Sequence, residues 1–300
     1  MKSTRFGKNL GFLHVKTFGA TDMQTIEIKR KPLEIKDFVK RSAATSDYKT
    51  LIAEPCLITE NGVPRILYTK VDPGQSQAIR SAVKAIKYST GTRTAGIKTT
   101  SAIFGYNPRN TIRKNYCSAT AMAVNDQKNH AAICAFGETL ASLYAEFFPD
   151  VYKTHQGVVG AKMLPEWVIG QTPFTSGIVN KNNPLKYHFD GGNIKDVLSN
   201  MVVFKRGVVG GFLSCPEFGI GFECADNTVI LFDGQNILHG VTPIQKQSEH
   251  SYRYSVVYYT LQQIWNCKPI SEEIVFARQN RAKRERNRVF GGTNLRRKDT

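Results

Sequence analysis

The run Leu185-Lys-Tyr-His-Phe-Asp190 is one of about eight short segments of β-type residues that follow Pro173. Gly, Asn, Pro and Asp separate these segments, as turn residues separate the strands of a β-sheet. The segments are residues 174–179, 185–190, 200–206, 211–215, 221–224, 228–232, 237–241 and 252–261. Strands of this number and spacing predict a double-stranded β-helix, the jelly roll of cupin-like proteins.

The N-terminal half predicts supporting structure around this core. Apolar segments within residues 51–71 flank Glu60-Asn-Gly62, a turn signal that closes β-hairpins. Residues 75–88 and 125–148 carry apolar side chains at helical spacing, and Pro149 ends the second helix. We therefore expect an α+β protein in which helices and a small N-terminal sheet support the jelly roll.

Length and composition predict one catalytic domain. A chain of 300 residues with 41% hydrophobic content is long enough for one large core and an accessory layer. We divide it into an N-terminal accessory region (residues 1–89), a catalytic domain (residues 90–268) and a basic C-terminal helix and tail (residues 269–300).

The formal net charge of +17 favours a polyanionic partner, with nucleic acid as the first expectation. The alternative is that the charge only keeps the protein soluble. Residues 278–300 hold nine Lys and Arg against two acidic residues. This end is either a solvated helix with a frayed tail or an arm that grips a nucleic-acid backbone, and we favour the arm because so many cations repel one another without a partner. Its candidate phosphate contacts are Lys283, Arg284, Arg286 and Arg288, with a second basic segment at residues 109–114.

The six cysteines are scattered and form no Cys-x-x-Cys pair, so neither a zinc ribbon nor a disulfide scaffold is expected. The basic N-terminus is not followed by an apolar signal-type run, and no stretch has the length needed to span a bilayer. We therefore expect a reducing intracellular location, the host cytoplasm if the chain is viral or bacterial.

A candidate metal site lies in the predicted jelly roll. His188 and Asp190 are two residues apart on a predicted strand, so both side chains face the same side. His239, at the start of a later strand, offers a third ligand. Two histidines and one carboxylate form the facial triad of non-haem iron(II) oxygenases. A single histidine on a strand is more often a hydrogen-bonded core residue, so this interpretation depends on the neighbouring residues.

Arg253 and Ser255 supply that context on the last strong strand. Alternation places Arg253, Ser255, Val257 and Tyr259 on one face. An inward arginine is costly inside a barrel unless an anion receives it. The distal carboxylate of 2-oxoglutarate is such an anion, and a planar guanidinium can hold it in a forked contact.

With these residues the chain resembles the TET/JBP family of 2-oxoglutarate dioxygenases, which oxidise the 5-methyl group of pyrimidine bases in nucleic acid. The similarity covers roughly residues 90–268. Its compact form, without a cysteine-rich insert, looks more like the bacteriophage and JBP-like members than the large animal enzymes. The motifs that carry it are TPFTSGIVNKN (172–182), YHFDGGN (187–193), GGFLSCPE (210–217), LFDGQNILHGVTPI (231–244) and YRYSVVYY (252–259).

The resemblance implies iron(II) ligands at His188, Asp190 and His239, and 2-oxoglutarate contacts at Arg253 and Ser255. It also implies that Asn193 hydrogen-bonds the target base and that Tyr259 stacks on it. At Leu261 the sequence departs from the animal enzymes, which place a base-contacting histidine there, so the resemblance supports methyl oxidation more strongly than cytosine recognition. In the Arg- and Lys-rich stretch around residues 93–113, Arg109 is the predicted contact to the co-substrate or to a phosphate.

The expected reaction is hydroxylation of the 5-methyl group of 5-methylcytosine in DNA, with further oxidation left open. A methyl group in a stacked duplex cannot reach a buried metal, so the base must be flipped out or presented on a single strand. Thymine, giving 5-hydroxymethyluracil, is one alternative substrate. RNA, a protein side chain and a free nucleotide are others, and a non-enzymatic nucleic-acid-binding jelly roll is the third possibility.

Overall fold

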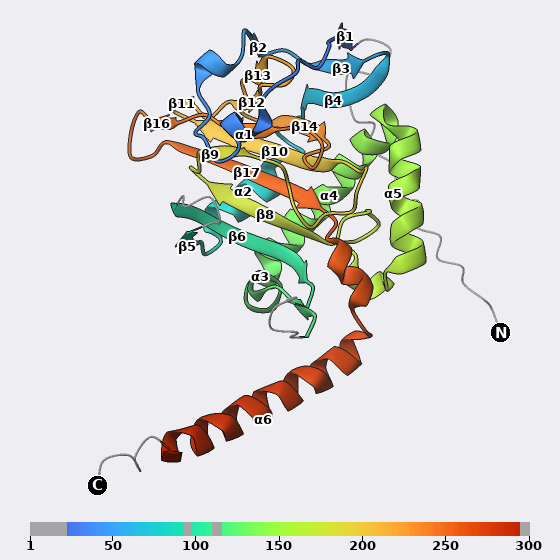
Figure 1. Ribbon diagram of the computed structural model, residues 1–300, viewed down its shortest axis with the longest axis vertical. Coiled ribbons are helices and arrows are strands. Elements are labelled where there is room, and N and C mark those ends of the chain that lie inside the picture. Colours follow the sequence, from blue (N-terminus) through green and yellow to red (C-terminus); the bar gives the residue numbers. More distant parts are fainter. Residues whose placement is uncertain (1–22, 93–97, 110–115, 295–300) are drawn as a thin grey trace, which may run out of the picture.

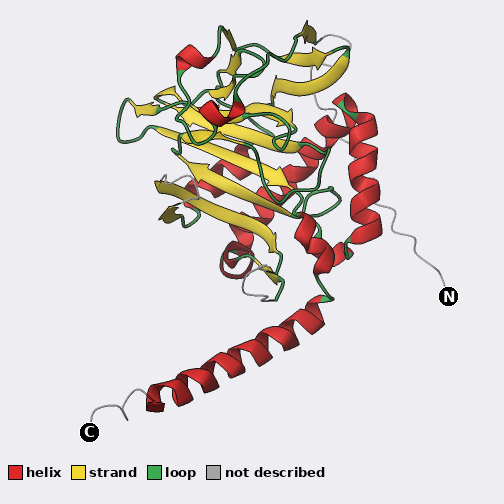
Figure 2. Cartoon of the chain, viewed as in Figure 1, coloured by secondary structure: helices red, strands yellow, loops and turns green. Residues whose placement is uncertain are grey.

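The computed structural model describes residues 23–92, 98–109 and 116–294, with side chains up to residue 287. All eight strands expected after Pro173 are present within one or two residues of the predicted positions. They form two facing sheets, with the two helices at residues 127–147 and 149–162 behind and beside them (Figures 1 and 2). The α+β jelly roll predicted from the sequence is therefore confirmed.

The large sheet forms one wall of the jelly roll and runs through the whole molecule. Its core neighbours β14, β10, β17 and β8 pair antiparallel throughout. In spatial order, the large sheet contains β1 (Gln24–Glu27), β3 (Cys56–Glu60), β4 (Val63–Lys70), β14 (Thr228–Phe232), β10 (Ser199–Arg206), β17 (Tyr252–Tyr259), β8 (Ser176–Lys181), β6 (Lys98–Asn107) and β5 (Ser89–Thr92), with β7 (Ser118–Ala119) paired to β6.

The second sheet forms the opposite wall. Its strands, in spatial order, are β2 (Thr50–Ile52), β13 (Ile220–Phe222), β12 (Leu213–Cys215), β15 (His239–Val241) and β9 (Leu185–His188). A short ribbon of β11 (Val208–Gly210) and β16 (Ile244–Lys246) stands apart from both sheets. Met201, Val203 and Ile230 of the large sheet pack against Leu213 and Phe222 of the second, so an apolar core fills the space between the walls.

Strand alternation gives the large sheet a second apolar face, which the helices cover. Val202 and Val256 point outward, opposite to Met201 and Val203, and pack against Leu140 of α4. The helices are α1 (Ile35–Phe38), α2 (Gln77–Ala85), α3 (Ala121–Asn125), α4 (Gln127–Phe147), α5 (Pro149–Lys162) and α6 (Ile270–Asn294), with short 3₁₀ turns at Thr45–Asp47, Pro165–Trp167 and Gln262–Asn266. The two predicted helices correspond to α2 and α4.

The hairpin predicted around Asn61-Gly62 is present as β3 and β4, but it does not make a small sheet of its own. Strand β4 pairs with β14 and extends the large sheet, while β2 pairs with β13 and extends the second. Free strand edges expose unpaired backbone groups, and joining an existing sheet satisfies them. The N-terminal strands therefore enlarge both walls of the jelly roll.

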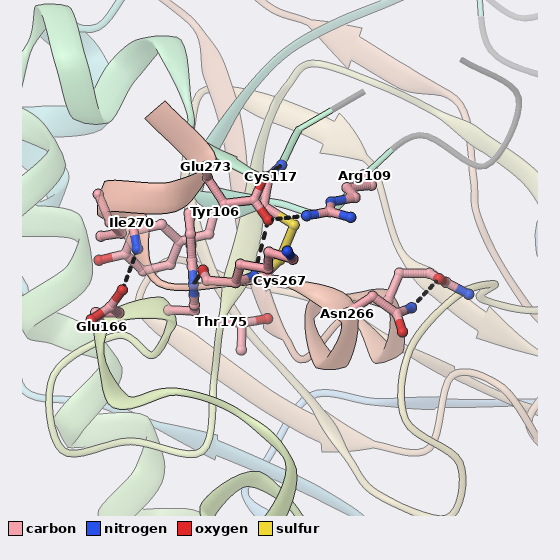
Figure 3. Close-up of a disulfide and its surroundings, with 12 residues drawn as sticks. Tyr106, Arg109, Cys117, Glu166, Thr175, Asn266, Cys267, Ile270 and Glu273 are labelled. Atoms are coloured by element: carbon pink, nitrogen blue, oxygen red, sulfur yellow. Dashed lines mark hydrogen bonds and ion pairs between the residues drawn. A yellow bond between two sulfur atoms is a disulfide. The ribbon is translucent and has the colours of Figure 1, made fainter. Parts of the chain in front are cut away.

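Helix α6 leaves the body of the molecule and projects away from it (Figure 1). Its base is held by Glu273, which is 2% exposed and accepts backbone hydrogen bonds from Cys117 and Lys268. A disulfide between Cys117 and Cys267 lies beside this contact (Figure 3). The scattered cysteine spacing gave no indication of this bond, because its two sulfurs are 150 residues apart in the chain. Among the described residues, every helix is too short or too polar to cross a membrane.

Candidate active site

The three predicted metal ligands converge at one end of the second sheet. His188 ends β9 and His239 begins β15, and the two residues are direct cross-strand partners. Asp190 follows β9, where its backbone N–H donates to the carbonyl of Gly234. One carboxylate oxygen, Oδ1 of Asp190, lies 3.6 Å from Nε2 of His188 and 3.8 Å from Nε2 of His239. All three ligand atoms lie within 4.8 Å of one another, a spacing that one ion can bridge.

Both imidazoles are held with the same nitrogen toward this point. Nδ1 of His188 donates to the carbonyl of Lys186 at 2.8 Å, and Nδ1 of His239 donates to the carbonyl of Ile237 at 2.9 Å. A carbonyl only accepts, so the proton of each neutral ring sits on Nδ1 and the lone pair on Nε2 faces the centre. Metal-ligating histidines are usually oriented in this way by their second nitrogen.

The charges of the three side chains also suit a cation. The pKa of His239 is lowered to about 4, mainly by burial. The charge of His188 also lowers this pKa, and its effect is larger than the opposite effect of Asp190. Burial alone raises the pKa of Asp190, but the hydrogen bond with His188 and the charges of both histidines lower it overall. At neutral pH this leaves a neutral His239 imidazole beside the carboxylate anion of Asp190. Two nitrogen donors and one oxygen donor with open positions suit iron(II).

Arg253 is buried on the facing large sheet, and no ion pair joins it to an acidic side chain of the described residues. It lies on β17, is 1% exposed, and packs so closely on Gly211 that a Cβ there would lie 2.6 Å from its Cδ. Two of its guanidinium nitrogens, Nε and Nη2, have no hydrogen-bond partner among the described residues. A buried cation with unpaired N–H groups is strongly destabilising unless a ligand completes it. A carboxylate fits this requirement.

A cavity of about 420 Å³ lies beside the three metal ligands. His188, Asp190 and His239 line it, and so does Ser255, two residues along the inward face from Arg253. The other predicted contacts also line the cavity: Asn193, which is 8% exposed, and the half-buried Tyr259, together with Leu261. Asn193 and Leu261 face each other in an isolated β-bridge. The structure thus places the metal ligands, Ser255 and the two predicted base contacts around one cavity, whereas Arg253 is not among its lining residues.

Arg109 does not join them. Its guanidinium pairs with Glu273 at 2.5 Å at the base of α6 (Figure 3). The same guanidinium lies over the ring of Phe276. This contact is part of the anchor of α6, so the structure gives Arg109 a partner other than the co-substrate. Residues 110–114 of the predicted basic segment lie outside the described residues.

The predicted backbone contacts lie on α6, away from the cavity. Lys283, Arg284 and Arg286 are exposed on this helix. Arg288 is within α6, but its side chain lies outside the described residues.

Sequence reasoning missed Gly234. A Cβ at this position would lie 2.2 Å from Oδ2 of Asp190, so only glycine leaves room for the carboxylate in its present position. The Asp-Gly pair after a strand has the form of an ordinary turn, and the contact with Asp190 spans 44 residues of chain. Local sequence carries no signal for it.

Comparison with known proteins gives matches over the same part of the chain. A family model, Tet_JBP, described as the oxygenase domain of the 2OGFeDO superfamily, matches residues 101–262. Thymine dioxygenase JBP1 of Trypanosoma brucei brucei is 24% identical over 168 residues, covering 55% of this chain and 19% of that protein. The bifunctional helicase and thymine dioxygenase JBP2 of the same organism is 28% identical over 122 residues, covering 41% and 11%. The chain thus spans about a fifth or less of these relatives.

Among solved structures, NgTET1 in complex with 5mC DNA matches with a TM-score of 0.58 and 12% sequence identity. The match covers 85% of this chain and 90% of NgTET1. At this identity the likeness establishes a shared fold.

Proposed function

Because the chain belongs to the TET/JBP family, oxygenases that use iron(II) and 2-oxoglutarate, we propose that it hydroxylates the 5-methyl group of 5-methylcytosine in DNA. One observation carries this proposal: the facial triad, Ser255 and the two predicted base contacts all line one cavity. Arg253, two of whose guanidinium nitrogens have no partner among the described residues, is buried two residues from Ser255 on the same strand. Bound iron(II) would activate dioxygen as the oxidant, with 2-oxoglutarate giving the other two electrons as it is converted to succinate and carbon dioxide, while the protein supplies ligation and orientation.

In this proposal, His188, Asp190 and His239 bind the iron. Their Nδ1 hydrogen bonds and the Asp190 backbone contact fix the ligand atoms before the metal arrives, which reduces the cost of ordering them. Arg253 and Ser255 bind the distal carboxylate of 2-oxoglutarate. The unpaired N–H groups of Arg253 then gain the acceptors they lack, and the co-substrate is oriented toward the metal.

The remaining wall of the cavity receives the base. The side-chain amide of Asn193 offers both a donor and an acceptor, and the ring of Tyr259 offers a stacking surface. Stacking and edge recognition require a base that has left the helix. Flipping the base also brings its methyl group to the metal and away from bulk water.

Two supporting facts favour different bases. The structural match that covers most of both chains was solved with 5mC DNA. The matched curated relatives are thymine dioxygenases, and Leu261 adds an apolar contact but no hydrogen bond to an exocyclic amino group. Thymine is therefore the second candidate. Mass spectrometry of nucleosides separates the two after incubation with iron(II), 2-oxoglutarate and DNA that contains both methylated bases.

We expect 5-hydroxymethylcytosine in that digest. Appearance of 5-hydroxymethyluracil alone would transfer the assignment to thymine. Parallel reactions with methylated RNA and with free nucleotides test whether the base must be part of DNA. Hydroxylation of either in preference to DNA would contradict the proposal.

We predict that Gly234→Ala weakens iron binding by roughly 10- to 100-fold, the usual effect of disturbing the groups that orient a metal ligand. The added methyl group must displace the Asp190 carboxylate, which it would approach to 2.2 Å. Anaerobic iron(II) titration measures the change. The matched control is Gly191→Ala in the adjoining loop, because a Cβ there meets no atom within 4 Å. Equal iron affinity in the two variants would contradict the role given to Gly234.

We also predict that α6 binds DNA phosphates. Replacing Lys283, Arg284 and Arg286 with Gln should reduce the slope of log K against log salt for duplex DNA by about 0.9 for each phosphate that is no longer neutralised. The KM for DNA should rise while kcat changes little, since the helix is remote from the cavity. A control triple variant at the exposed Lys36, Lys49 and Lys246 has the same net charge. Identical slopes in the two triple variants would show that α6 does not bind DNA.

A further inference from the structure

A buried carboxylate holds the chain immediately before the metal ligand His239. Strand β15 begins at His239, but its pairing with β12 begins only at Gly240, opposite Ser214. The backbone N–H of Leu238 therefore lies outside this ladder, although the Leu238 side chain is fully buried. A buried N–H needs an acceptor, and Oε2 of Glu217 provides one at 2.7 Å.

The other oxygen of this carboxylate faces Arg30. Nη1 of Arg30 lies 3.4 Å from Oε1 of Glu217 and donates to the carbonyl of Asn236 at 2.9 Å. Nε of Arg30 lies 3.4 Å from Oε1 of Glu60, and the guanidinium lies over the ring of Phe218. The side chain of Glu217 is 8% exposed, so the neighbouring cation offsets part of the cost of burying its charge. We refer to these two side chains as the Arg30–Glu217 pair.

The Arg30–Glu217 pair fixes both ends of a three-residue segment, residues 236–238. Arg30 binds the carbonyl of its first residue, and Glu217 binds the N–H of its last. The carbonyl between them, that of Ile237, accepts the hydrogen bond from Nδ1 of His239 and so directs Nε2 of that ring toward the other ligands. The pair thus holds the group that orients the imidazole.

Arg30 belongs to a part of the chain that the family model does not match, since the match covers residues 101–262. Two backbone hydrogen bonds tie its segment to the jelly roll. The N–H of Ile28 donates to the carbonyl of Thr59, and the N–H of Lys31 donates to the carbonyl of Glu217. The N-terminal segment therefore contacts Glu217 through its main chain as well as through Arg30.

We propose that Glu217 and Arg30 are positioning residues for His239, which makes the N-terminal segment a working part of the metal site. This inference rests on the metal site of the proposed function. Without the pair, the segment before His239 loses two of its fixed points, and the imidazole must be ordered when the metal binds. A ligand that is not held in advance binds more weakly.

The test is anaerobic iron(II) titration of the whole chain, with the visible spectrum of the cobalt(II) form as a second readout. Cobalt(II) absorption depends on the number and geometry of its ligands. For Glu217→Leu we expect the Kd of iron(II) to rise roughly 10- to 100-fold, the usual range for residues that orient a metal ligand, and the cobalt spectrum to change. Glu217→Gln keeps a side-chain oxygen for the N–H of Leu238 and should retain most of the affinity.

Arg30→Met should also raise the Kd, and it keeps the test valid if Glu217→Leu does not fold. The double variant should bind iron(II) little more weakly than Glu217→Leu alone, because both residues act on one segment.

Each variant has a matched control. Arg65→Met removes another arginine paired with Glu60, at 3.1 Å, and Arg65 forms no hydrogen bond or ion pair with Glu217 or residues 236–238 in the described ranges. Glu27→Leu removes another carboxylate that accepts backbone N–H groups, but from β1 at the edge of the large sheet. Both controls should keep the wild-type Kd and cobalt spectrum.

A role in stability alone predicts a different outcome. Glu217→Leu and Arg30→Met would then lower the Tm, but well below that temperature the iron Kd and the cobalt spectrum would equal those of wild type. That result would overturn the inference and leave the proposed function intact. Wild-type protein that binds no iron(II) would overturn both.

Discussion

Asp190→Asn is expected to lower the rate of base hydroxylation by more than about 100-fold, which exceeds the reduction usually caused by changing a partner of a ligand. The amide keeps the size of the carboxylate but removes its negative charge, and Asp190 is the one acidic member of the triad. Its Oδ1 lies between the Nε2 atoms of both histidines, so the substitution weakens the whole donor set. Iron affinity and hydroxylated nucleosides should fall together.

The control for this variant is Asp196→Asn in the same loop. Asp196 is exposed and has a positive φ of 60°, a conformation that Asn also adopts readily. We expect wild-type iron affinity and turnover in that protein. An Asp190→Asn enzyme that retained full iron affinity would remove Asp190 from the ligand set.

Arg253→Met is expected to weaken 2-oxoglutarate binding by roughly 30- to 1,000-fold, since removal of one partner of a buried charge pair costs about 2–4 kcal/mol. The stability of the ligand-free protein, in contrast, should not fall. Nε and Nη2 of Arg253 are unpaired without a ligand, so an apolar side chain of similar length removes a buried charge and leaves the ligand-free protein as stable as wild type or more stable. The stabilisation that 2-oxoglutarate gives wild type should disappear.

Thermal unfolding with and without 2-oxoglutarate measures both effects. Arg206→Met, at an exposed position at the end of β10, is the matched control and should keep the ligand-induced rise in Tm. A ligand-free Arg253→Met protein that unfolds far below wild type would show that Arg253 has a structural partner, and would contradict its assignment to the co-substrate.

The sequence predicted the active-site layer well because alternation along strands is a local property. His188 and Asp190 are two residues apart, as are Arg253 and Ser255, and period two alone places each pair on one face. Turn residues marked the strand ends, so the eight core strands were located. The jelly-roll interpretation, which the structure confirms, was needed to bring the two pairs to one cavity; His188, Asp190 and Ser255 line that cavity, and Arg253 does not.

Other features depend on contacts between distant segments, which local patterns do not encode. The N-terminal strands were expected as a separate sheet, but β2 pairs with β13 of the second sheet and β4 pairs with β14 of the large sheet. Arg109 was predicted to contact the co-substrate or a phosphate, but it pairs with the carboxylate of Glu273, which is 164 residues away in the chain. Helix α5 was also missed, since only His155 and Val159 of its 14 residues are buried and its apolar pattern is weak.

The most direct test of this account is coupled turnover on DNA with and without methylated bases. With iron(II), 2-oxoglutarate and 5-methylcytosine DNA, we predict one succinate released for each hydroxymethylcytosine formed, and little succinate on unmethylated DNA. Succinate release that is independent of methylated DNA, with no oxidised pyrimidine in the nucleoside digest, would contradict the claim that this cavity oxidises a DNA base.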